Sequence, residues 1–536
     1  MTEVAAGHVL TGQSRPDLDR GLSVANVVLF GAWLAAGLLF TAYSLYSDIS
    51  QSGTPARTFL PFLLLGVALL IALGFEFVNG FHDTANAVAT VIYTNSLPPN
   101  TAVIWSGFWN FLGVLFSTGA VAFGIVSVLP VELILQVGTS AGFAMVFALL
   151  IAAIVWNLGT WYFGLPSSSS HTLIGSIIGV GVANQLMRTG NATSGVDWSQ
   201  AQKIGYSLLL SPLVGFTCAA ILLLVSKHAI PNAALYRAPA GNTPPPWWIR
   251  GLLVLTCTGV SFAHGSNDGQ KGMGLIMLIL IGTVPTAYAL NRAMPEEAVT
   301  QFSTVAASAR ESLSAMIRDE AAPADARAAL ADYVRMQTLN DATLPALAAV
   351  AGDIAYQVKS YGTFAKLPAD AVQNVRNDMY LASESIRLMK KNGDPKFTDE
   401  AIRNLDELQK LLNASTKFIP TWVKIAVAIA LGLGTMIGWR RIVVTVGEKI
   451  GKRHLTYAQG GVAELVAMGT ILAADNYGLP VSTTHVLSSG VAGTMAANGS
   501  GLQWDTVKNL LMTWILTLPA AILLSGALYF LFYNLF

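Results

Sequence analysis

The sequence predicts an all-α polytopic membrane protein, built as an inverted-topology repeat of two halves plus a mainly helical extramembrane insert. Of its 536 residues, 53% are hydrophobic and 11% are charged, whereas about a quarter of the residues in a typical soluble protein are charged. Apolar windows long enough to cross a bilayer core of about 30 Å recur along the chain. Two motifs also occur twice each. Together these observations exclude an ordinary soluble enzyme.

The apolar windows predict about ten to twelve membrane spans. The first is expected to be a retained anchor rather than a signal peptide, because no small-residue cleavage site follows it. Two of the windows, 58–92 and 251–290, are expected to be interrupted. The other clear windows lie at 25–46, 102–128, 141–163, 204–226, 421–438, 457–474 and 507–534, with shorter Gly/Ser-rich windows at 164–182 and 478–497.

Charge is concentrated in one region. Residues 291–417 contain 15 Lys/Arg and 17 Asp/Glu of the 61 formal charges in the chain. Their Ala/Leu/charged composition predicts a small bundle of amphipathic helices outside the membrane. The net charge of +1 gives no indication of nucleic-acid binding. The two cysteines, Cys218 and Cys257, lie in apolar context and predict neither a disulfide framework nor a metal cage.

Loop charges set the expected orientation, because Lys and Arg in short loops favour the cytoplasmic side. The basic residues before the first window, within 227–250 and within 440–453 are therefore expected in the cytoplasm, and the insert on the opposite side. The expected domains are an N-terminal extension with one extra transmembrane helix (1–57), the first membrane half (58–228), a cytoplasmic linker (229–250), the start of the second half (251–290), a periplasmic helical insert (291–418) and the remainder of the second half (419–536).

An internal repeat is the most informative feature of the sequence. Residues 77–86 (FVNGFHDTAN) align with residues 262–271 (FAHGSNDGQK) and share Phe, Gly and Asp at fixed spacing. Residues 164–171 (GLPSSSSH) align still more closely with residues 478–485 (GLPVSTTH). The chain is therefore predicted to contain two equivalent halves.

The spacing of the motifs agrees with this division. Asp83 and His171 are 88 residues apart, Asp268 and His485 are 217 apart, and the difference of 129 is almost the length of the charged insert. The expected orientation also makes the window of the first motif run inward in one half and outward in the other. Inverted repeats of this kind are typical of secondary transporters, whose substrate site lies near the membrane midplane where the halves meet.

Few ionisable residues lie inside the windows. Each charged group costs at least about 2.5–3.5 kcal/mol at the bilayer centre, so a function or a paired partner is expected for each. Asp83 and Asp268 occupy equivalent positions in the two halves, which favours a function for both. Glu76 and Lys271 are further candidates for this central site. The alternative is structural pairing of Asp268 with Lys271, which lies three residues later on the same helix face.

The hydroxyl-rich motifs predict helix starts. Pro166 and Pro480 suit the first helical turn, and the Ser/Thr runs that follow supply caps and hydrogen-bond donors. Two opposed helix N-termini facing one cavity would suit a small tetrahedral oxyanion. The alternative is that these small residues only allow close helix packing. Three histidines are either buried structural residues or proton-handling groups, namely His82, His171 and His485.

Charge counting favours coupled transport over an open anion channel. A phosphate dianion would meet Lys271 as the one obvious intramembrane cation, beside two aspartates, so protons, sodium or a divalent metal would have to accompany it. The sequence matches no phosphate-binding loop, dinucleotide fingerprint or zinc-ligand spacing. No metal site and no cofactor are therefore predicted. An intramembrane serine hydrolase using Ser168–Ser170 with His171 is a less favoured alternative, because adjacent Ser and His do not form a triad.

The motifs resemble those of the inorganic phosphate transporter (Pit) family, specifically its bacterial low-affinity, proton-coupled branch. The resemblance rests on residues 80–94, residues 265–272, the paired Pro-hydroxyl-His motifs and the GWRR sequence at 438–441, and it extends from about residue 58 to 534. It implies re-entrant helical hairpins whose tips bind phosphate, a multi-pass inner-membrane location and a homodimer. The residues that it places at the hairpin tips are Ser168, Ser169, Ser170, Ser482, Thr483 and Thr484, and those lining the central site are Asp83, Asn86, Asn267 and Asp268.

One departure from the wider family bears on the coupling ion. Sodium-coupled members have Asn-Asp followed by a second Asn in both copies, whereas here His82 precedes Asp83 and Lys271 replaces the later Asn. The expected function is therefore proton symport of inorganic phosphate, carried free or as a neutral complex with a divalent metal such as Mg, Ca or Zn. The alternatives are sodium coupling and another oxyanion such as sulfate or arsenate.

Overall fold

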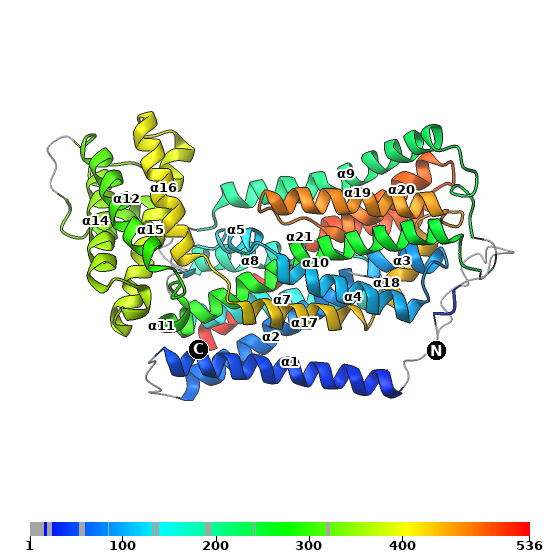
Figure 1. Cartoon of the computed structure of the whole chain (residues 1–536), viewed down its shortest axis with the longest axis horizontal. Helices are drawn as coiled ribbons and strands as arrows, with labels where there is room; N and C mark the ends of the chain where they lie inside the picture. The colour runs from blue at the N-terminus through cyan, green and yellow to red at the C-terminus, as the bar shows by residue number, and fades with distance from the viewer. Residues whose placement is uncertain are drawn as a thin grey trace.

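The computed structural model is entirely helical in the part of the chain that it describes, apart from one isolated β-bridge between Gly451 and Leu502. It describes residues 16–18, 24–52, 59–83, 85–130, 133–134, 139–187, 195–239, 241, 243–317 and 322–535. Most long helices run along the longest axis of the molecule, and the helices of the charged insert form a separate bundle at one end (Figure 1).

The helices fall into three groups along the chain. The N-terminal extension and first half contain α1 (Val24–Gln51), α2 (Phe59–Asp83), α3 (Ala85–Tyr93), α4 (Pro99–Phe116), α5 (Ala120–Val126), α7 (Ser140–Tyr162), α8 (Ser169–Met187) and α9 (Trp198–Ala229). The second half contains α10 (Trp247–Thr283), α11 (Pro285–Tyr288), α17 (Thr421–Thr435), α18 (Arg440–Val444), η2 (Thr445–Lys449), α19 (Tyr457–Asn476), α20 (Thr483–Ala497) and α21 (Trp504–Leu535). The insert contains α12 (Glu296–Ser314), α13 (Ala326–Met336), α14 (Thr343–Tyr361), η1 (Phe364–Lys366), α15 (Ala369–Asn392) and α16 (Asp399–Thr416).

The expectation of an all-helical, multi-span protein is confirmed. Among the described residues, five helices are long and apolar enough to cross a membrane, or up to seven if each of two bent helix pairs is one span. This count is below the ten to twelve spans expected from the sequence. Helix α10 is not among the five, since polar residues from His264 to Lys271 occupy its middle. The 251–290 window is interrupted, but only near its end: α10 runs unbroken through the motif to Thr283, and α11 begins at Pro285.

The two halves exchange equivalent contacts. Helix α4 packs on α10 and α17 packs on α2, while α8 packs on α21 and α20 packs on α9. The helix pairs α4–α10 and α17–α2 each make their close contact through a glycine. A Cβ atom added at Gly113 would lie 2.1 Å from the carbonyl oxygen of Phe262, and one added at Gly434 would lie 2.1 Å from that of Phe77. Phe77 and Phe262 are aligned residues of the repeated motif, so the repeat extends to backbone packing.

The Gly113 contact gives a first prediction. Gly113→Ala should destabilise the fold by about 1–3 kcal/mol, because the new methyl group would overlap the backbone of α10. The matched control is Gly251→Ala on α10, where an added Cβ atom meets nothing within 4 Å. Thermal unfolding of the purified variants, followed by tryptophan fluorescence, would show the difference. Equal melting temperatures for the two variants would contradict the proposed crossing.

The two Gly-Leu-Pro motifs begin in the same way. Helix α7 is followed by Gly164 with φ of +67°, and α19 by Gly478 with φ of +63°, a conformation that favours glycine. Helices α8 and α20 start at Ser169 and Thr483, and the side chains of the preceding Ser168 and Ser482 accept the N–H groups of His171 and His485, each at 3.1 Å. Pro166 and Pro480 therefore lie just before the helices, not in their first turns, because serine caps define the starts.

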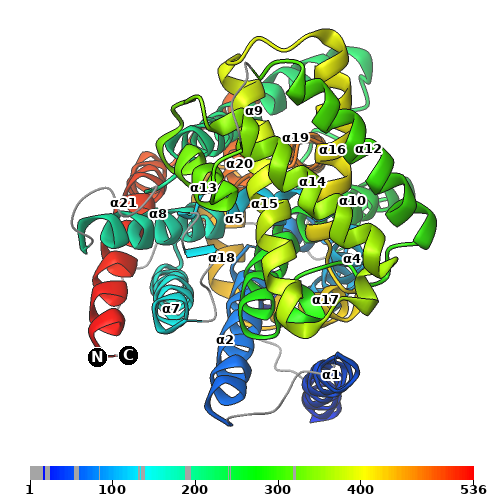
Figure 2. The same cartoon turned by 90° about the vertical axis from the view of Figure 1, so that its left-hand side faces the viewer.

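The insert packs onto one end of the membrane helices. Its apolar residues belong to the same buried cluster as the ends of α2, α7 and α10. Figure 2 views this end and shows the insert in front of part of the bundle, whereas α1, α7 and α21 lie beside it. The basic segments at 227–250 and 440–453 lie at the opposite end in Figure 1.

An ion-pair group joins the insert to the start of α9. Arg387 of α15 contacts Glu384 and places Nη2 3.0 Å from Oδ2 of Asp197, the N-cap residue of α9. Burial opposes ionisation of Asp197, but hydrogen bonds from Ser199 and from the N–H of Gln200, together with Arg387, outweigh it and lower the pKa of Asp197 below its ordinary value. This junction should therefore depend on pH.

A lowered carboxyl pKa contributes stability that is complete above the unfolded pKa of about 3.9 and is lost as the pH falls through the folded pKa. Asp197→Asn should thus lower the stability of the protein by about 1 kcal/mol at neutral pH. The difference from wild type should vanish well below pH 4. Melting temperatures measured from neutral to acidic pH, with exposed Asp505→Asn as control, would check this. A difference that persists unchanged in acid would contradict it.

Candidate functional site

Asp83, the last residue of α2, lies at the meeting point of the two hydroxyl-rich helix starts. Its Oδ2 accepts a hydrogen bond from Ser169 Oγ of α8 at 2.5 Å, and its Oδ1 accepts one from Thr484 Oγ1 of α20 at 2.7 Å. The residue is 3% exposed. One carboxylate thus connects two helix N-termini that are 315 residues apart in the chain.

Asp268 of α10 lies beside this group and is completely buried. Its Oδ2 is 2.7 Å from the ammonium of Lys271, which also donates to Ser169 Oγ at 3.1 Å. Ser169 Oγ lies 3.5 Å from the same carboxylate oxygen. The pairing of Asp268 with Lys271 weighed from the sequence therefore occurs, but within the cluster that contains Asp83. Ser169 contacts Asp83, Asp268 and Lys271 at once. We call these four residues the central cluster.

The other hydroxyl residues of the two motifs have separate positions. Ser170 Oγ donates to the carbonyl of Val481 at 2.6 Å and so connects the two helix starts directly. Ser168 and Ser482 are the capping residues described above. Thr483 Oγ1 is buried and has no hydrogen-bond partner among the described residues. Of the candidate hydroxyl residues, Ser169 and Thr484 donate hydrogen bonds to the Asp83 carboxylate. Within the part of the chain that the structure describes, the others make no hydrogen bond to it.

Asn267 and His82 occupy aligned positions: Asn267 contacts the loop before α20, and His82 contacts the loop before α8. Asn267 Nδ2 donates to the carbonyl of Leu479 at 3.1 Å, and its Oδ1 accepts the N–H of Val481 at 3.4 Å. His82 Nε2 lies 3.3 Å from Ser167 Oγ, and its Nδ1 lies 3.0 Å from Asp83 Oδ1. His82 therefore contacts Asp83 as well, and the two residues hold the loops before α8 and α20 in place.

His171 and His485 are brought together but lie outside the carboxylate cluster. Their ring centroids are 4.7 Å apart, and His485 stacks on Trp514 at 4.1 Å. Both line a mainly apolar cavity of about 380 Å³ between α8, α9 and α21. Among the described residues, His171 Nδ1 and His485 Nε2 are buried without a hydrogen-bond partner.

Two other candidates are not seen in the cluster. Glu76 is fully buried and accepts a hydrogen bond from Asn79 at 3.3 Å, and its side chain packs where a Cβ atom on Gly272 would be. It makes no direct hydrogen bond with Asp83 or Asp268. The side chain of Asn86 lies outside the described residues.

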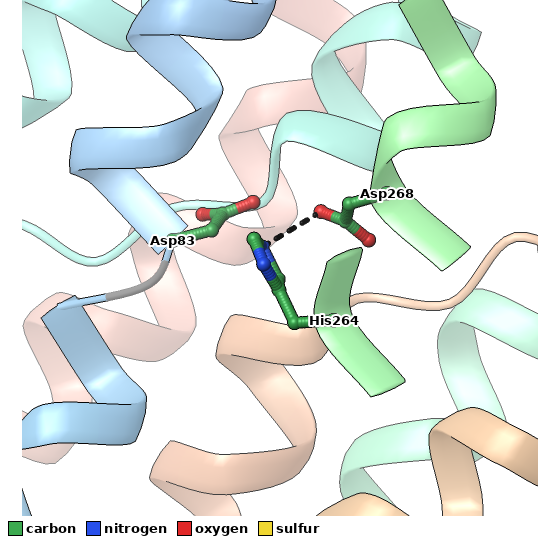
Figure 3. A group of neighbouring side chains, drawn as sticks. All are labelled: Asp83, His264 and Asp268. Atoms are coloured by element: carbon green, nitrogen blue, oxygen red, sulfur yellow. Dashed lines mark ion pairs between the residues drawn. The ribbon is translucent and has the colours of Figure 1, made fainter. Parts of the chain in front are cut away.

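His264 was not singled out from the sequence, although it contacts the central cluster. Its Nε2 lies 3.3 Å from Asp268 Oδ2 (Figure 3). Its Nδ1 lies 2.6 Å from Asn110 Oδ1. The i, i+4 spacing of His264 and Asp268 on one helix face is the signal that could have revealed it.

The side chains in Figure 3 also form the one group of metal-ligand type found among the described residues. One ligand atom each from Asp83, His264 and Asp268 lies within 4.8 Å of the others. No metal ligand set was predicted from sequence spacing. Carboxylate and imidazole could bind a cation here, but the Lys271 ammonium already contacts Asp268.

A second buried carboxylate lies away from this cluster. Glu464 of α19 accepts hydrogen bonds from the hydroxyls of Thr90 on α3 and Thr256 on α10. Glu464 is 0% exposed. Its two threonine partners come from distant segments, so no local pattern could have indicated them.

Fold and site together define a multi-span membrane transport protein: two halves with equivalent contacts enclose a buried polar centre. The model of the phosphate transporter family (PHO4) matches residues 79–525. The chain belongs to this family, which confirms the resemblance noted in the sequence and identifies the protein as a transporter rather than an enzyme.

Individual relatives agree with this assignment. The low-affinity inorganic phosphate transporter PitA of Escherichia coli (strain K12) is 43% identical over 487 residues, covering 88% of this chain and 96% of that protein. PitB of the same strain is 42% identical over 489 residues, with the same coverage. The low-affinity inorganic phosphate transporter of Buchnera aphidicola subsp. Acyrthosiphon pisum is 38% identical, covering 91% of this chain and 98% of that protein. A solved structure, "The sodium-dependent phosphate transporter", aligns with a TM-score of 0.49 and 20% identity, covering 88% of this chain and 100% of that chain.

Proposed function

We propose that this protein is a low-affinity symporter that takes up inorganic phosphate with protons across the inner membrane of a bacterial cell. Phosphate is carried as the free ion or as a neutral complex with a divalent metal. The observation that carries the proposal is the cluster in which Asp83 accepts hydrogen bonds from both helix starts, beside Lys271. Hydroxyls, helix N-termini and an ammonium group are donors suited to a tetrahedral oxyanion.

The charges of the cluster support proton coupling. Asp83, Asp268 and Lys271 together carry one net negative charge when ionised, so a phosphate dianion needs accompanying positive charge. His82 and His264 contact the two aspartates and can each accept a proton. Lys271 occupies the space beside Asp268 where a sodium ion would otherwise find carboxylate ligands. Protons on the histidines or aspartates therefore neutralise the substrate more readily than sodium.

The proposed architecture is an inverted repeat with two re-entrant hairpins, α7–α8 and α19–α20, whose tips meet at Asp83. The exchanged helix contacts and the matching glycine turns support it. The basic segments at the end opposite the insert support a cytoplasmic location for that end and a periplasmic location for the insert. In this arrangement the central site is closed to both sides, and transport requires the hairpins to move.

Uptake of radiolabelled phosphate into proteoliposomes tests the coupling ion. An inward proton gradient imposed without sodium should drive accumulation well above the equilibrium level, because each phosphate would carry protons down their gradient. Collapse of the gradient with a protonophore is the control. Uptake that follows a sodium gradient and ignores the pH gradient would refute proton coupling.

Parallel assays separate the alternatives. Stimulation by Mg²⁺ under the same gradient would indicate the metal–phosphate complex, whereas insensitivity to Mg²⁺ would indicate the free ion. Excess sulfate should compete weakly if the site selects phosphate. The serine hydrolase alternative is disfavoured by the family assignment, and labelling of Ser168–Ser170 by a covalent serine probe would revive it.

A further inference from the structure

A second polar cavity lies away from the central site, where the insert meets the membrane helices. It has a volume of about 420 Å³, and its walls come from α5, the start of α9 and the insert helices α15 and α16. A narrower recess of about 50 Å³ shares Phe123, Ser127, Glu384 and Lys417 with it and continues to Gly274 and Met277 of α10. Figure 2 shows the insert helices over this end of the bundle. We call the two recesses together the junction cavity.

The charged residues around the junction cavity are mainly cationic. Arg376, Arg387 and Lys417 face two carboxylates, Glu384 and Asp197. Arg387 contacts both carboxylates: its Nε lies 2.9 Å from Glu384 Oε1 and its Nη2 lies 3.0 Å from Asp197 Oδ2. The three cations therefore exceed the two carboxylates by one positive charge, and Arg387 is the cation that contacts both carboxylates.

Arg376 is a buried cation without a carboxylate partner. It is 6% exposed, its Nη1 donates to Asn377 Oδ1 at 3.2 Å, and its guanidinium lies 5.2 Å from the ring centroid of Tyr380. Its Nε has no hydrogen-bond partner, and no carboxylate lies within 4 Å of it among the described residues. Burial lowers the pKa of Arg376, which reflects a charge left uncompensated. Arginine is rarely buried unless it is paired, so a partner is missing.

Lys417 is the second unpaired cation of the junction cavity. It lines both recesses, and its ammonium makes no hydrogen bond or ion pair in the described part of the chain. Surrounding protein lowers the pKa of Lys417, and the nearby charges of Arg387 and Arg376 add to this effect while Glu384 opposes it. Arg376 and Lys417 form no ion pair among the described residues, and with one net positive charge the cavity suits an anion with several acceptor oxygens.

We propose that the junction cavity is a second binding site for a phosphate group, held by Arg376 and Lys417 beside Arg387. The identity of the ligand as inorganic phosphate rests on the proposed function. On the periplasmic side, the cavity would collect phosphate for the central site, since Met277 is only six residues, or about 9 Å of helix rise, from Lys271. A phospholipid headgroup offers the same chemistry, and the test separates the two sources.

The test compares Lys417→Gln with charge-conserving Lys417→Arg and with the exposed control Lys410→Gln. In nanodiscs of phosphatidylcholine, the full chain should bind two radiolabelled phosphates, and Lys417→Gln only one. In proteoliposomes at low ionic strength, Lys417→Gln should raise KM for phosphate about three- to tenfold with an unchanged maximal rate, and high salt should remove the difference. Lys417→Arg and Lys410→Gln should match wild type.

Three outcomes would overturn the proposal. One is unchanged stoichiometry and KM in both Lys417→Gln and Arg376→Gln, with each variant shown to be folded by size-exclusion chromatography. Another is displacement of labelled phosphate from the junction cavity by phosphatidylglycerol, which would assign the cavity to lipid. The third is equal loss of binding in Lys410→Gln, which would indicate nonspecific charge.

Lys417-dependent binding without any uptake by wild type would instead refute only the proposed function. Asp268→Asn should keep the junction cavity's phosphate while it loses uptake, which distinguishes the two sites.

Discussion

Asp83→Asn should reduce phosphate uptake by at least about 100-fold while the protein remains folded in the membrane, since each lost charge-assisted hydrogen bond is worth about 1.5–3 kcal/mol. The carboxylate accepts from Ser169 and Thr484 at the same time, and an amide can accept through one atom only. The variant would therefore break the connection between the two helix starts. Initial uptake rates in proteoliposomes, normalised to reconstituted protein, measure this effect.

Asp505→Asn is a matched control for this substitution, because it makes the same chemical change at an exposed position at the start of α21. It should transport at the wild-type rate. Asp268→Asn should resemble Asp83→Asn. Wild-type uptake in both Asp83→Asn and Asp268→Asn would remove the central cluster from the transport path.

Lys271→Met should destabilise the protein by about 3–5 kcal/mol and abolish proton-driven uptake, because it leaves buried Asp268 without its cation. Methionine has a similar length and keeps the packing, so the loss would report the charge. The double variant Lys271→Met/Asp268→Asn should recover most of the stability, since it removes both partners of the pair. It should not recover uptake. Thermal unfolding of the wild type and the three variants as a double-mutant cycle measures the coupling.

One result of the double-mutant cycle would contradict the predicted coupling of Lys271 with Asp268. If the two single substitutions have additive effects on stability, Lys271 and Asp268 do not form the buried pair seen at 2.7 Å. If Lys271→Met gains sodium-dependent uptake, Lys271 takes the place of a sodium ion in the cluster. That second result would strengthen the proposed role of Lys271 in selecting protons.

Local sequence patterns predicted most of the helices. The windows at 25–46, 204–226 and 507–534 correspond to α1, α9 and α21, because apolar length is a local property of the chain. The division into equivalent halves came from motif identity, and the matching contacts of Gly113 and Gly434 are in line with it. The unbroken course of α10 was missed, because packing on α4 and internal pairing of Asp268 with Lys271 keep its polar segment helical.

The sequence predicted which types of residue form the site, but not which of these residues contact one another. The hydroxyl runs and the two aspartates were candidates from the sequence, yet nothing local distinguishes Ser169, which contacts the carboxylates, from its neighbours Ser168 and Ser170. His171 and His485 had the same motif position and the same candidate role, but they pack on each other and on Trp514. Which face of a helix meets the opposite half decides these assignments.

The sequence by itself determined the membrane character of the chain, the two repeated motifs, the charge-rich segment at 291–417 and the residue types of the centre. Each of these follows from composition or from order along the chain. The tertiary structure alone decided that Asp83 joins the starts of α8 and α20, that His264 contacts the central cluster and that Arg376 and Lys417 share a cavity. Such contacts depend on how residues hundreds of positions apart are oriented when helices pack, and covalent order does not encode that orientation locally.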